Sequence, residues 1–330
     1  MIQIFQEMIL ITCFSISFDY FIGEPPNVIH PVIWMGKIIK FSIGKIKKRN
    51  NKKTHRINER ISGSILAICL TTITGIFTYL IILQSFYIIE TILFVLLSTF
   101  ILKSTFAIKS MDKHIRDILN DIEKKEIEKA RYDLSKIVSR NTKTLSEKNI
   151  LSACIECIAE SFVDGILSPL FYYGILNIPG AVMFRVINTL DSMIGYKDKY
   201  YINIGWMSAK MDTIMNFIPA RLSIFFMVLA SLIINQDWKS AILIYKRDAK
   251  KTESLNAGIP MSIMAGALKI QLEKIGYYKL GDMNEHITTE KCKTALKITK
   301  IATIIYIIGF LFPIIVLLNL LNWWSIFFGY

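Results

Sequence analysis

Histidine and cysteine are scarce in this chain of 330 residues, and both are scattered along it. The five cysteines give an odd count without the spacing of a disulfide framework. The one close pair, Cys154 and Cys157, has no second pair and no histidine nearby, whereas a zinc site needs about four ligands. We therefore expect this pair to serve helix packing rather than metal or redox chemistry. The chain is expected to carry no structural zinc and no haem.

Familiar phosphate-binding and hydrolase signatures are also missing. The chain contains no G-x-x-x-x-G-K-[ST], no G-x-G-x-x-G, no H-E-x-x-H and no G-x-S-x-G. An ATP-using protein with this sequence would need another kind of phosphate site. The N-terminus lacks a basic region and a small-x-small cleavage site, so we expect it to remain on the mature protein.

Long apolar runs dominate what is present, since 53% of the residues are hydrophobic. A helix must be about 20 residues long to cross a hydrocarbon core of about 30 Å. Runs of that length occupy residues 61–84, 86–106, 214–235 and 301–330, and residues 1–22 form a weaker candidate that contains two acidic residues. This pattern predicts an all-α, polytopic integral protein of the cell membrane with four or five crossings. Almost nothing separates the first two strong runs in the sequence, which predicts a tight helical hairpin.

Basic residues outnumber acidic ones, and the formal net charge is +13. The densely basic stretch 37–60 is typical of a cytoplasmic loop under the positive-inside rule. It would also suit anionic lipid or a phosphorylated substrate. Nucleic-acid binding is not favoured, because no recognised nucleic-acid fold accompanies the charge. Lysine-rich segments on both sides of 214–235 imply either a further crossing, such as 166–184, or a re-entrant segment broken near Pro219 and Arg221.

The polar middle of the chain has helical periodicity. Residues 109–138 place isoleucine and leucine at helical spacing among many charges, which predicts an amphipathic helix or helix pair on the cytoplasmic side. Thr144 and Glu147 fit a capping box, so a helix should begin near Leu145. We expect it to run to about Asp164 and to be stopped by the glycine and proline that follow.

On such a helix, Glu156, Glu160 and Asp164 would form one acidic stripe at i, i+4 and i+8. Like charges at that spacing repel, and a Mg²⁺ ion or a cationic partner would relieve the repulsion. An ordinary solvated face fits the same pattern, because the opposite side of the helix is apolar. The pattern alone does not choose between the two.

Residues 18–36 contain a rigid turn where a membrane helix would meet water. Its glycine and prolines restrict the backbone, and it holds the carboxylates of Asp19 and Glu24 and the imidazole of His30. Rigid polar groups at such a boundary indicate a site rather than a linker.

The densest polar cluster spans residues 185–197. In a helical arrangement, Arg185 neighbours Asn188, and Asn188 neighbours Asp191, with Gly195 ending the helix. Arginine offers a planar fork for phosphate or carboxylate, and aspartate and asparagine oxygens suit Mg²⁺. A structural ion-pair network is the alternative, and the sequence does not exclude it.

Further polar groups follow inside or beside apolar segments. Asp212 ends the segment 205–212, and Arg221 lies in an apolar run, where a charge either marks a site or reaches the interface. Asn256 lies in the later segment 248–266. The small residues around 265–268 would permit close helix packing.

Taken together, these motifs resemble the CobD/CbiB family, the adenosylcobinamide-phosphate synthases of cobalamin biosynthesis. The matching blocks appear in the family's order and cover nearly the whole chain: 19–26 (DYFIGEPP), 30–36 (HPVIWMG), 137–142 (IVSRNT), 155–170 (IECIAESFVDGILSPL), 179–197 (PGAVMFRVINTLDSMIGYK), 205–212 (GWMSAKMD), 219–222 (PARL) and 265–268 (AGAL). The block with NTLDSM and GYK is highly specific.

The resemblance implies an ATP- and Mg²⁺-dependent ligase. It would join aminopropanol, or its O-phosphate, to the f-propionate carboxyl of (adenosyl)cobyric acid. Its expected partners are the corrinoid and amino alcohol substrates, the lipid bilayer and other cobalamin-pathway enzymes, with no nucleic acid. We expect one membrane-embedded domain, with N-terminal membrane segments in 1–108, a largely cytoplasmic motif region in 109–213 and C-terminal membrane segments in 214–330.

Roles can be assigned on this resemblance. Candidates for catalysis are Glu160, Asp164, Asp191 and Asp212, with Glu160, Asp164 and Asp191 as Mg²⁺ ligands. Candidates for binding substrate or phosphate are Arg185, Asn188, Lys197, Arg221, Asp19, Glu24, His30 and Asn256.

This chain departs from the family pattern at several positions. Asn141 and Thr213 stand where the family has aspartate, and Ser161 stands where it has asparagine. The segment from Thr252 to Asn256 lacks the family's histidine and proline. A corrinoid-binding scaffold without catalysis, or a transporter, is the alternative. A transporter is disfavoured because the chain shows no internal duplication.

Overall fold

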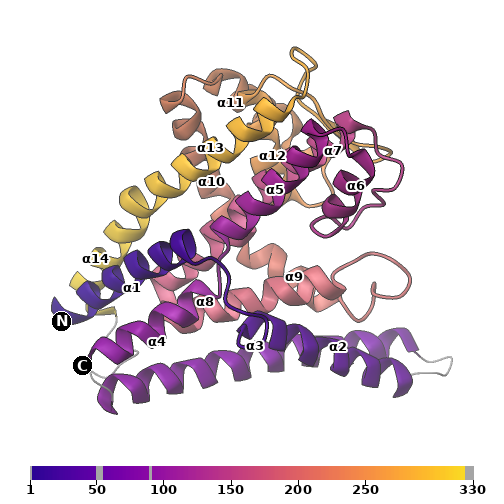
Figure 1. The fold of residues 1–330 in the computed structure, drawn as a ribbon. Helices are drawn as coiled ribbons and strands as arrows, with labels where there is room; N and C mark the ends of the chain where they lie inside the picture. Colours follow the sequence, from indigo (N-terminus) through magenta and orange to yellow (C-terminus); the bar gives the residue numbers. More distant parts are fainter. Residues whose placement is uncertain (1, 50–54, 89–90, 324–330) are drawn as a thin grey trace. The chain divides into compact units, whose positions relative to one another are not determined.

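The computed structural model describes residues 2–49, 55–88 and 91–323, and in these ranges the chain is almost entirely helical (Figure 1). The chain divides into two compact units built from alternating stretches of sequence. The first unit comprises Met1–Ala107, Ser168–Met215 and Leu311–Tyr330, and the second comprises Ile108–Leu167 and Asn216–Phe310. The predicted all-α fold is confirmed. The predicted organisation as one domain with three successive regions stays a prediction.

Long apolar helices form the first unit. Helix α3 packs along α8 and α9, and α1 packs against α4. The buried hydroxyl of Tyr173 donates to the carbonyl of Met8 at 2.8 Å, which ties α8 to α1. The helices are α1 (Ile2–Phe21), α2 (Pro31–Arg49), α3 (His55–Ile88), α4 (Thr91–Lys103), α8 (Ser168–Ile194), α9 (Trp206–Met215) and α14 (Phe312–Leu320).

Helix α8 consists of two helical halves joined at a kink. Asn177 has φ 57° and ψ −160°, a conformation that non-glycine residues rarely adopt. Its side-chain Oδ1 accepts a hydrogen bond from the amide of Ile178 at 2.7 Å. Pro179 follows, at a position in the first turn of the second half where its missing N–H has no helical partner to lose.

The second unit is built around the buried helix α12, which packs against α7, α10 and α11. A Cβ atom at Gly266 would lie 2.5 Å from the Ser240 carbonyl oxygen, so α11 and α12 approach closely, as the small residues at 265–268 suggested. Its elements are α5 (Ile108–Glu123), α6 (Ile127–Ser135), α7 (Glu147–Phe162), α10 (Phe217–Ile233), α11 (Trp238–Asp248), α12 (Leu255–Ala267), the antiparallel strands β1 (Leu272–Lys274) and β2 (Tyr278–Leu280), and α13 (Thr289–Tyr306).

The amphipathic helix pair predicted for residues 109–138 is observed as α5 and α6. Helix α5 buries its apolar stripe, which includes Ile115, Ile118 and Ile122, and α6 buries Ala130 and Leu134. The predicted helix end before Gly195 is also observed, since α8 ends at Ile194.

The start predicted near Leu145, for the helix observed as α7, is wrong by two residues. Ser146, not Thr144, is the N-cap of α7, and its hydroxyl accepts from the amide of Asn149. Both residues have the hydroxyl that a cap needs, so the sequence offered two starts that differ by half a turn.

The predicted stop after Asp164 is wrong as well. Helix α7 ends at Phe162, and the backbone continues through a π-helical turn, Val163–Leu167, into α8. Gly165 lies inside that turn. Pro169 lies in the first turn of α8, where proline is tolerated.

Three helical segments of the described residues are long and apolar enough to cross a membrane: Ile57–Ser85, Thr91–Glu123 and Thr289–Leu320. A fourth candidate combines α9 with α10, which are separated by a break. The break falls at Asn216 rather than at Pro219, which lies in the first turn of α10. The lower of the predicted counts, four crossings, is reached only if this broken pair is one span. The turn predicted between the first two runs falls at Ser85, but α3 continues through Ser85 to Ile88, and α4 begins at Thr91. Residues 89–90 lie outside the described ranges.

Candidate functional site

A polar network in the first unit joins the second half of α8 to α9. Arg185 donates from Nη1 to Asn188 Oδ1 at 3.1 Å, as its helical spacing predicted. Asn188 in turn donates from Nδ2 to Asp212 Oδ1 at 3.5 Å, and Asn188 is 9% exposed. Asp212 thus joins the predicted cluster from a different helix. The network places a guanidinium, an amide and a carboxylate side by side, a set of groups suited to phosphate or carboxylate ligands.

The end of α8 places two further candidates near the start of a loop. The amide of Gly195 donates to the carbonyl of Asp191 at 2.7 Å, which closes the last turn of the helix. Asp191 is half-buried, and Lys197 is exposed two residues beyond Gly195. Lys197 therefore lies on the loop between α8 and α9, where a flexible cation can reach a bound anion.

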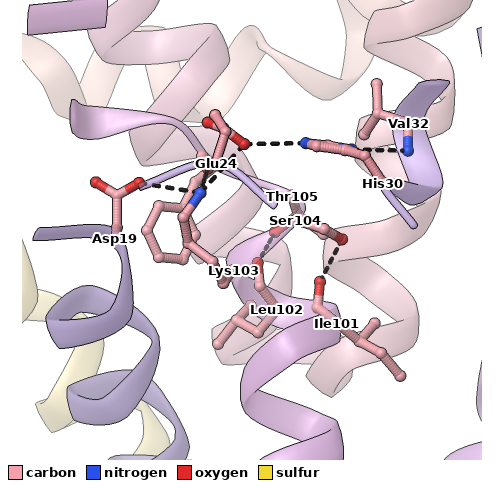
Figure 2. Close-up of polar contacts among 10 residues, drawn as sticks. Asp19, Glu24, His30, Val32, Ile101, Leu102, Lys103, Ser104 and Thr105 are labelled. Atoms are coloured by element: carbon pink, nitrogen blue, oxygen red, sulfur yellow. Dashed lines mark hydrogen bonds and ion pairs between the residues drawn. The ribbon is translucent and has the colours of Figure 1, made fainter. Parts of the chain in front are cut away.

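The N-terminal turn forms a second cluster in the first unit, and Figure 2 shows that its charged groups converge on one lysine. Lys103, at the end of α4, has a side chain with 0% exposure. Its Nζ lies 3.0 Å from Asp19 Oδ1 and 3.4 Å from Glu24 Oε2. It also donates to the carbonyl of Phe106 at 3.2 Å. A buried ammonium of this kind is stable only with such partners.

His30 completes the cluster in its neutral form. The amide of Val32 donates to His30 Nδ1 at 3.2 Å, so this nitrogen is the acceptor. Nε2 therefore carries the proton and donates to Glu24 Oε2 at 2.9 Å (Figure 2). Burial alone would raise the pKa of Glu24, but the hydrogen bond from His30 and the charge of Lys103 outweigh burial and lower it. Glu24 is therefore ionised at neutral pH.

Sequence reasoning brought Asp19, Glu24 and His30 together but missed Lys103. The signal was present, because a lysine inside the apolar run 86–106 requires a partner. What the sequence lacked was the pairing of this run with a turn more than seventy residues earlier.

In the second unit, Arg221 and Asn256 meet. Arg221 Nη1 donates to Asn256 Oδ1 at 2.7 Å and to the Phe217 carbonyl at 3.0 Å. Its guanidinium lies over the Phe217 ring, with Cζ 3.7 Å from the ring centre. These contacts hold the guanidinium at the start of α10, and they give the charge inside the apolar run a polar partner.

The acidic stripe predicted on one helix is not uniform. Glu156 is 2% exposed and is paired with Arg140, and it accepts from Ser152 at 2.8 Å and from the Tyr278 hydroxyl at 2.9 Å. Glu160 is exposed. Asp164 lies in the π turn rather than in α7, so the regular i, i+4, i+8 spacing is wrong. Arg140 is therefore the cationic partner that relieves the charge of Glu156.

Burial also determines the reactivity of the Cys154 and Cys157 thiols on α7. Both thiols are free, and burial raises the pKa of Cys157 to about 11 and that of Cys154 well above its ordinary value. Both are therefore protonated and weakly nucleophilic at neutral pH. This fits the packing role that the sequence favoured.

No group of three or more His, Cys, Asp or Glu side chains suited to a metal ion occurs among the described residues. A Mg²⁺ ion that uses one or two carboxylates together with substrate phosphates requires a smaller protein set. The carboxylate of Asp212, which accepts from Asn188 Nδ2 at 3.5 Å, is one such carboxylate.

The predicted site residues belong to both units. Asp19, Glu24, His30, Arg185, Asn188, Asp191, Lys197 and Asp212 lie in the first unit, and Glu160, Asp164, Arg221 and Asn256 lie in the second. The predicted meeting of these two sets in one pocket stays a prediction.

Comparisons with known proteins point to one family. The profile of the family described as "CobD/Cbib protein" matches residues 12–308. No solved structure matches this chain.

Curated relatives match along nearly their whole length. The "Probable cobalamin biosynthesis protein CobD" of Thermoplasma volcanium is 38% identical over 311 residues, which cover 94% of this chain and 99% of that protein. The protein of the same name from Methanothermobacter thermautotrophicus is 36% identical over 292 residues, covering 88% and 93%. The "Cobalamin biosynthesis protein CobD" of Dehalococcoides mccartyi is 35% identical over 279 residues, covering 84% and 88%.

Proposed function

This chain belongs to the CobD/CbiB family of cobalamin biosynthesis proteins, and on that premise we propose that it is a membrane-associated ligase that forms an amide bond on a corrinoid. The carboxyl substrate is the f-propionate of (adenosyl)cobyric acid, and the amine is aminopropanol or its O-phosphate. The observation that carries this proposal is the family match over residues 12–308, which contains every candidate site residue.

The reaction needs activation, because a carboxylate is a poor electrophile. In the proposed sequence, the propionate oxygen attacks the γ-phosphorus of ATP, and ADP leaves. The amine nitrogen then attacks the carbonyl carbon of the acyl phosphate, inorganic phosphate leaves, and the amine gives up a proton to a base. Such chemistry depends on positioning and charge stabilisation more than on covalent help from the protein.

The network of Arg185, Asn188 and Asp212 supports this proposal. Arg185 presents a guanidinium whose orientation is fixed by its bond to Asn188 at 3.1 Å, which favours binding of a phosphate or carboxylate oxygen. Lys197 supplies a mobile positive charge on the following loop. Asp191 and Asp212 are the carboxylates that we assign to the base and to the metal-binding role.

The second unit would contribute Arg221, held by Asn256 at 2.7 Å, as a further anion-binding group. Glu160 and Asp164 are the remaining acidic candidates there. A bound Mg²⁺ would supply charge neutralisation on the phosphates. Its candidate ligands are Asp191 and Asp212 in the first unit and Glu160 and Asp164 in the second, and one or two of them would suffice beside the substrate phosphates.

The proposal is tested with purified, detergent-solubilised protein given cobyric acid, aminopropanol phosphate and Mg-ATP. Product mass and ADP release are followed together, and amide product with one ADP per turnover is the expected result. Measurable corrinoid binding without amide product, for aminopropanol and its phosphate alike, would contradict the ligase and favour a scaffold or transporter.

Asp191→Asn tests the site within the same assay. Because the amide cannot act as a base and carries no charge, turnover should fall by more than about a hundredfold, the scale seen for loss of a group that acts at the reaction centre. Asp117→Asn on the exposed face of α5 is the matched control and should leave turnover unchanged. Full activity in a folded Asp191→Asn protein would remove Asp191 from the mechanism.

A further inference from the structure

The loop between α8 and α9, residues 195–205, is held by contacts from α2 and α3. Lys47 of α2 donates from Nζ to the carbonyl of Tyr200 at 2.6 Å, and this Nζ lies 4.4 Å from the centre of the Tyr200 ring. Glu59 of α3 fixes the same Nζ at 2.8 Å. The side chains of Lys47 and Glu59 are only 17% and 13% exposed, so solvent competes weakly for this ion pair.

The C-terminal end of the same loop is fixed by shape and by a second cation. A Cβ atom at Gly63 of α3 would lie 2.0 Å from the Ile204 carbonyl oxygen, so the loop rests directly on the α3 backbone there. At the start of α9, the Arg60 guanidinium lies over the Trp206 ring, with Cζ 3.8 Å from its centre. A cation over an aromatic ring is attracted by the negative face of the ring, so this contact ties the start of α9 to α3.

The middle of the loop is also ordered internally. Asp198 Oδ1 accepts from the amides of Tyr200 and Tyr201 at 2.7 and 2.9 Å. This aspartate turn presents the Tyr200 carbonyl that Lys47 binds. The loop is therefore a defined structure whose position depends on the ends of α2 and α3.

The geometry points to Lys47 as a positioning residue for the proposed reaction, an inference that rests on the proposed function. The loop begins beside Asp191 and carries Lys197, and it leads into the helix that carries Asp212. The contacts of Lys47 described above are with Tyr200 and Glu59. Lys47 acts by fixing Tyr200, which holds the loop and thereby sets where Lys197 and the start of α9 lie.

The positive charge of residues 37–60 could be supplied by any of their lysines, whereas the contact with Tyr200 is specific to Lys47. Neighbouring Lys45 allows these two roles to be compared. It is exposed, and its Nζ lies over the Phe41 ring of its own helix, 4.4 Å from the ring centre, rather than over the loop. If net positive charge were all that mattered in this stretch, the two lysines would be interchangeable.

The test compares Lys47→Gln, Lys47→Arg and Lys45→Gln in the full-length, detergent-solubilised protein. Amide hydrogen exchange of peptides covering residues 196–204 measures loop order without reference to activity. We expect faster exchange in Lys47→Gln, partial restoration in Lys47→Arg, and wild-type exchange in Lys45→Gln. Unchanged exchange in Lys47→Gln would overturn the inference that Lys47 holds the loop. Glu59→Gln, which releases Lys47 without removing it, should reproduce the effect in part.

Turnover provides the second measurement. Misplacement of catalytic groups by about 1 Å can cost a factor of about a hundred, so kcat of Lys47→Gln should fall by about tenfold or more, with KM for the amine changing less. Lys47→Arg should recover part of kcat, and Lys45→Gln should match the wild type. A loosened loop with unaltered kcat would overturn the positioning role. If the wild type forms no amide, the proposed function fails, and the exchange result still decides whether Lys47 holds the loop.

Discussion

Lys103 is the residue around which the N-terminal turn is organised. Its fully buried ammonium contacts two carboxylates from different segments, Asp19 at 3.0 Å and Glu24 at 3.4 Å. The cluster therefore pairs a cation with two carboxylates at the boundary of an apolar helix, where a charge is costly without a partner.

Replacing Lys103 by methionine should destabilise the protein. The substitution preserves the length of the side chain but leaves two carboxylates without their cation, and removal of one partner from a buried ion pair costs about 3–5 kcal/mol. We expect a clearly lower melting temperature in detergent. Lys113→Met, an exposed lysine on α5, is the control. Equal melting temperatures for the two variants would show that Lys103 is not needed to hold the turn.

The sequence predicted contacts between residues that are close together in the chain and missed contacts between distant segments. The neighbours Arg185 and Asn188 lie three residues apart on one helix, so helical geometry alone placed them together. Lys103 pairs with Asp19 and Glu24, and Arg140 pairs with Glu156, so each of these cations binds a carboxylate from another segment. Spacing along the chain carries no information on such pairs, although an unpaired charge in an apolar run signals that some partner exists.

The helices of this chain show where local patterns suffice and where they fail. The amphipathic pair α5 and α6 and the end of α8 at Ile194 followed from periodicity and from glycine. The continuation of α7 through Gly165 and Pro169 did not, because a π turn absorbs the glycine and the proline falls in a first turn. The kink at Asn177 left no sequence signal beyond the nearby proline.

Asn177 offers a test of how the kink in α8 is maintained. Its positive φ costs about 1–3 kcal/mol in a non-glycine residue, and its side chain offsets part of this by accepting from the Ile178 amide at 2.7 Å. Asn177→Ala loses that bond and keeps the strain, so its melting temperature should fall. Asn177→Gly loses the bond but relieves the strain, so it should melt higher than the alanine variant. Equal melting temperatures would contradict this account of the kink.

Neither of the two units of the molecule is continuous in sequence. The first is assembled from three stretches and the second from two, so their cores form only from contacts between distant segments. Hydropathy predicted the apolar runs and hence the membrane class, but it could not divide the chain in this way. The candidate site residues inherit the same division, which is why motifs that are regular in sequence belong to different units.

Within the second unit, Asp248 joins the end of α11 to the residue after β2. Its carboxylate is fully buried and is bound by Arg247 at 2.8 Å, by Lys251 at 2.5 Å and by the Gly281 amide at 2.8 Å. Burial alone would raise the pKa of Asp248, but these hydrogen bonds and charges lower it well below the ordinary value. The folded protein therefore binds a proton at this carboxylate only at a lower pH than the unfolded chain does.

The stability of the second unit should consequently depend on pH through Asp248. A carboxylate with a lowered pKa contributes stability that is fully present above its ordinary pKa of about 3.9 and is lost as the pH falls toward the lowered value. Asp248→Asn removes this contribution, so the variant should melt below the wild type at pH 7, and the difference in melting temperature should narrow as the pH falls below about 4. The measurement is thermal unfolding of the full chain in detergent at pH 7, 4 and 3, with the exposed Asp117→Asn as control. Other carboxylates that titrate in this range act equally on both proteins, so this difference isolates Asp248, and a difference that is independent of pH would show that this carboxylate is not held by its cations.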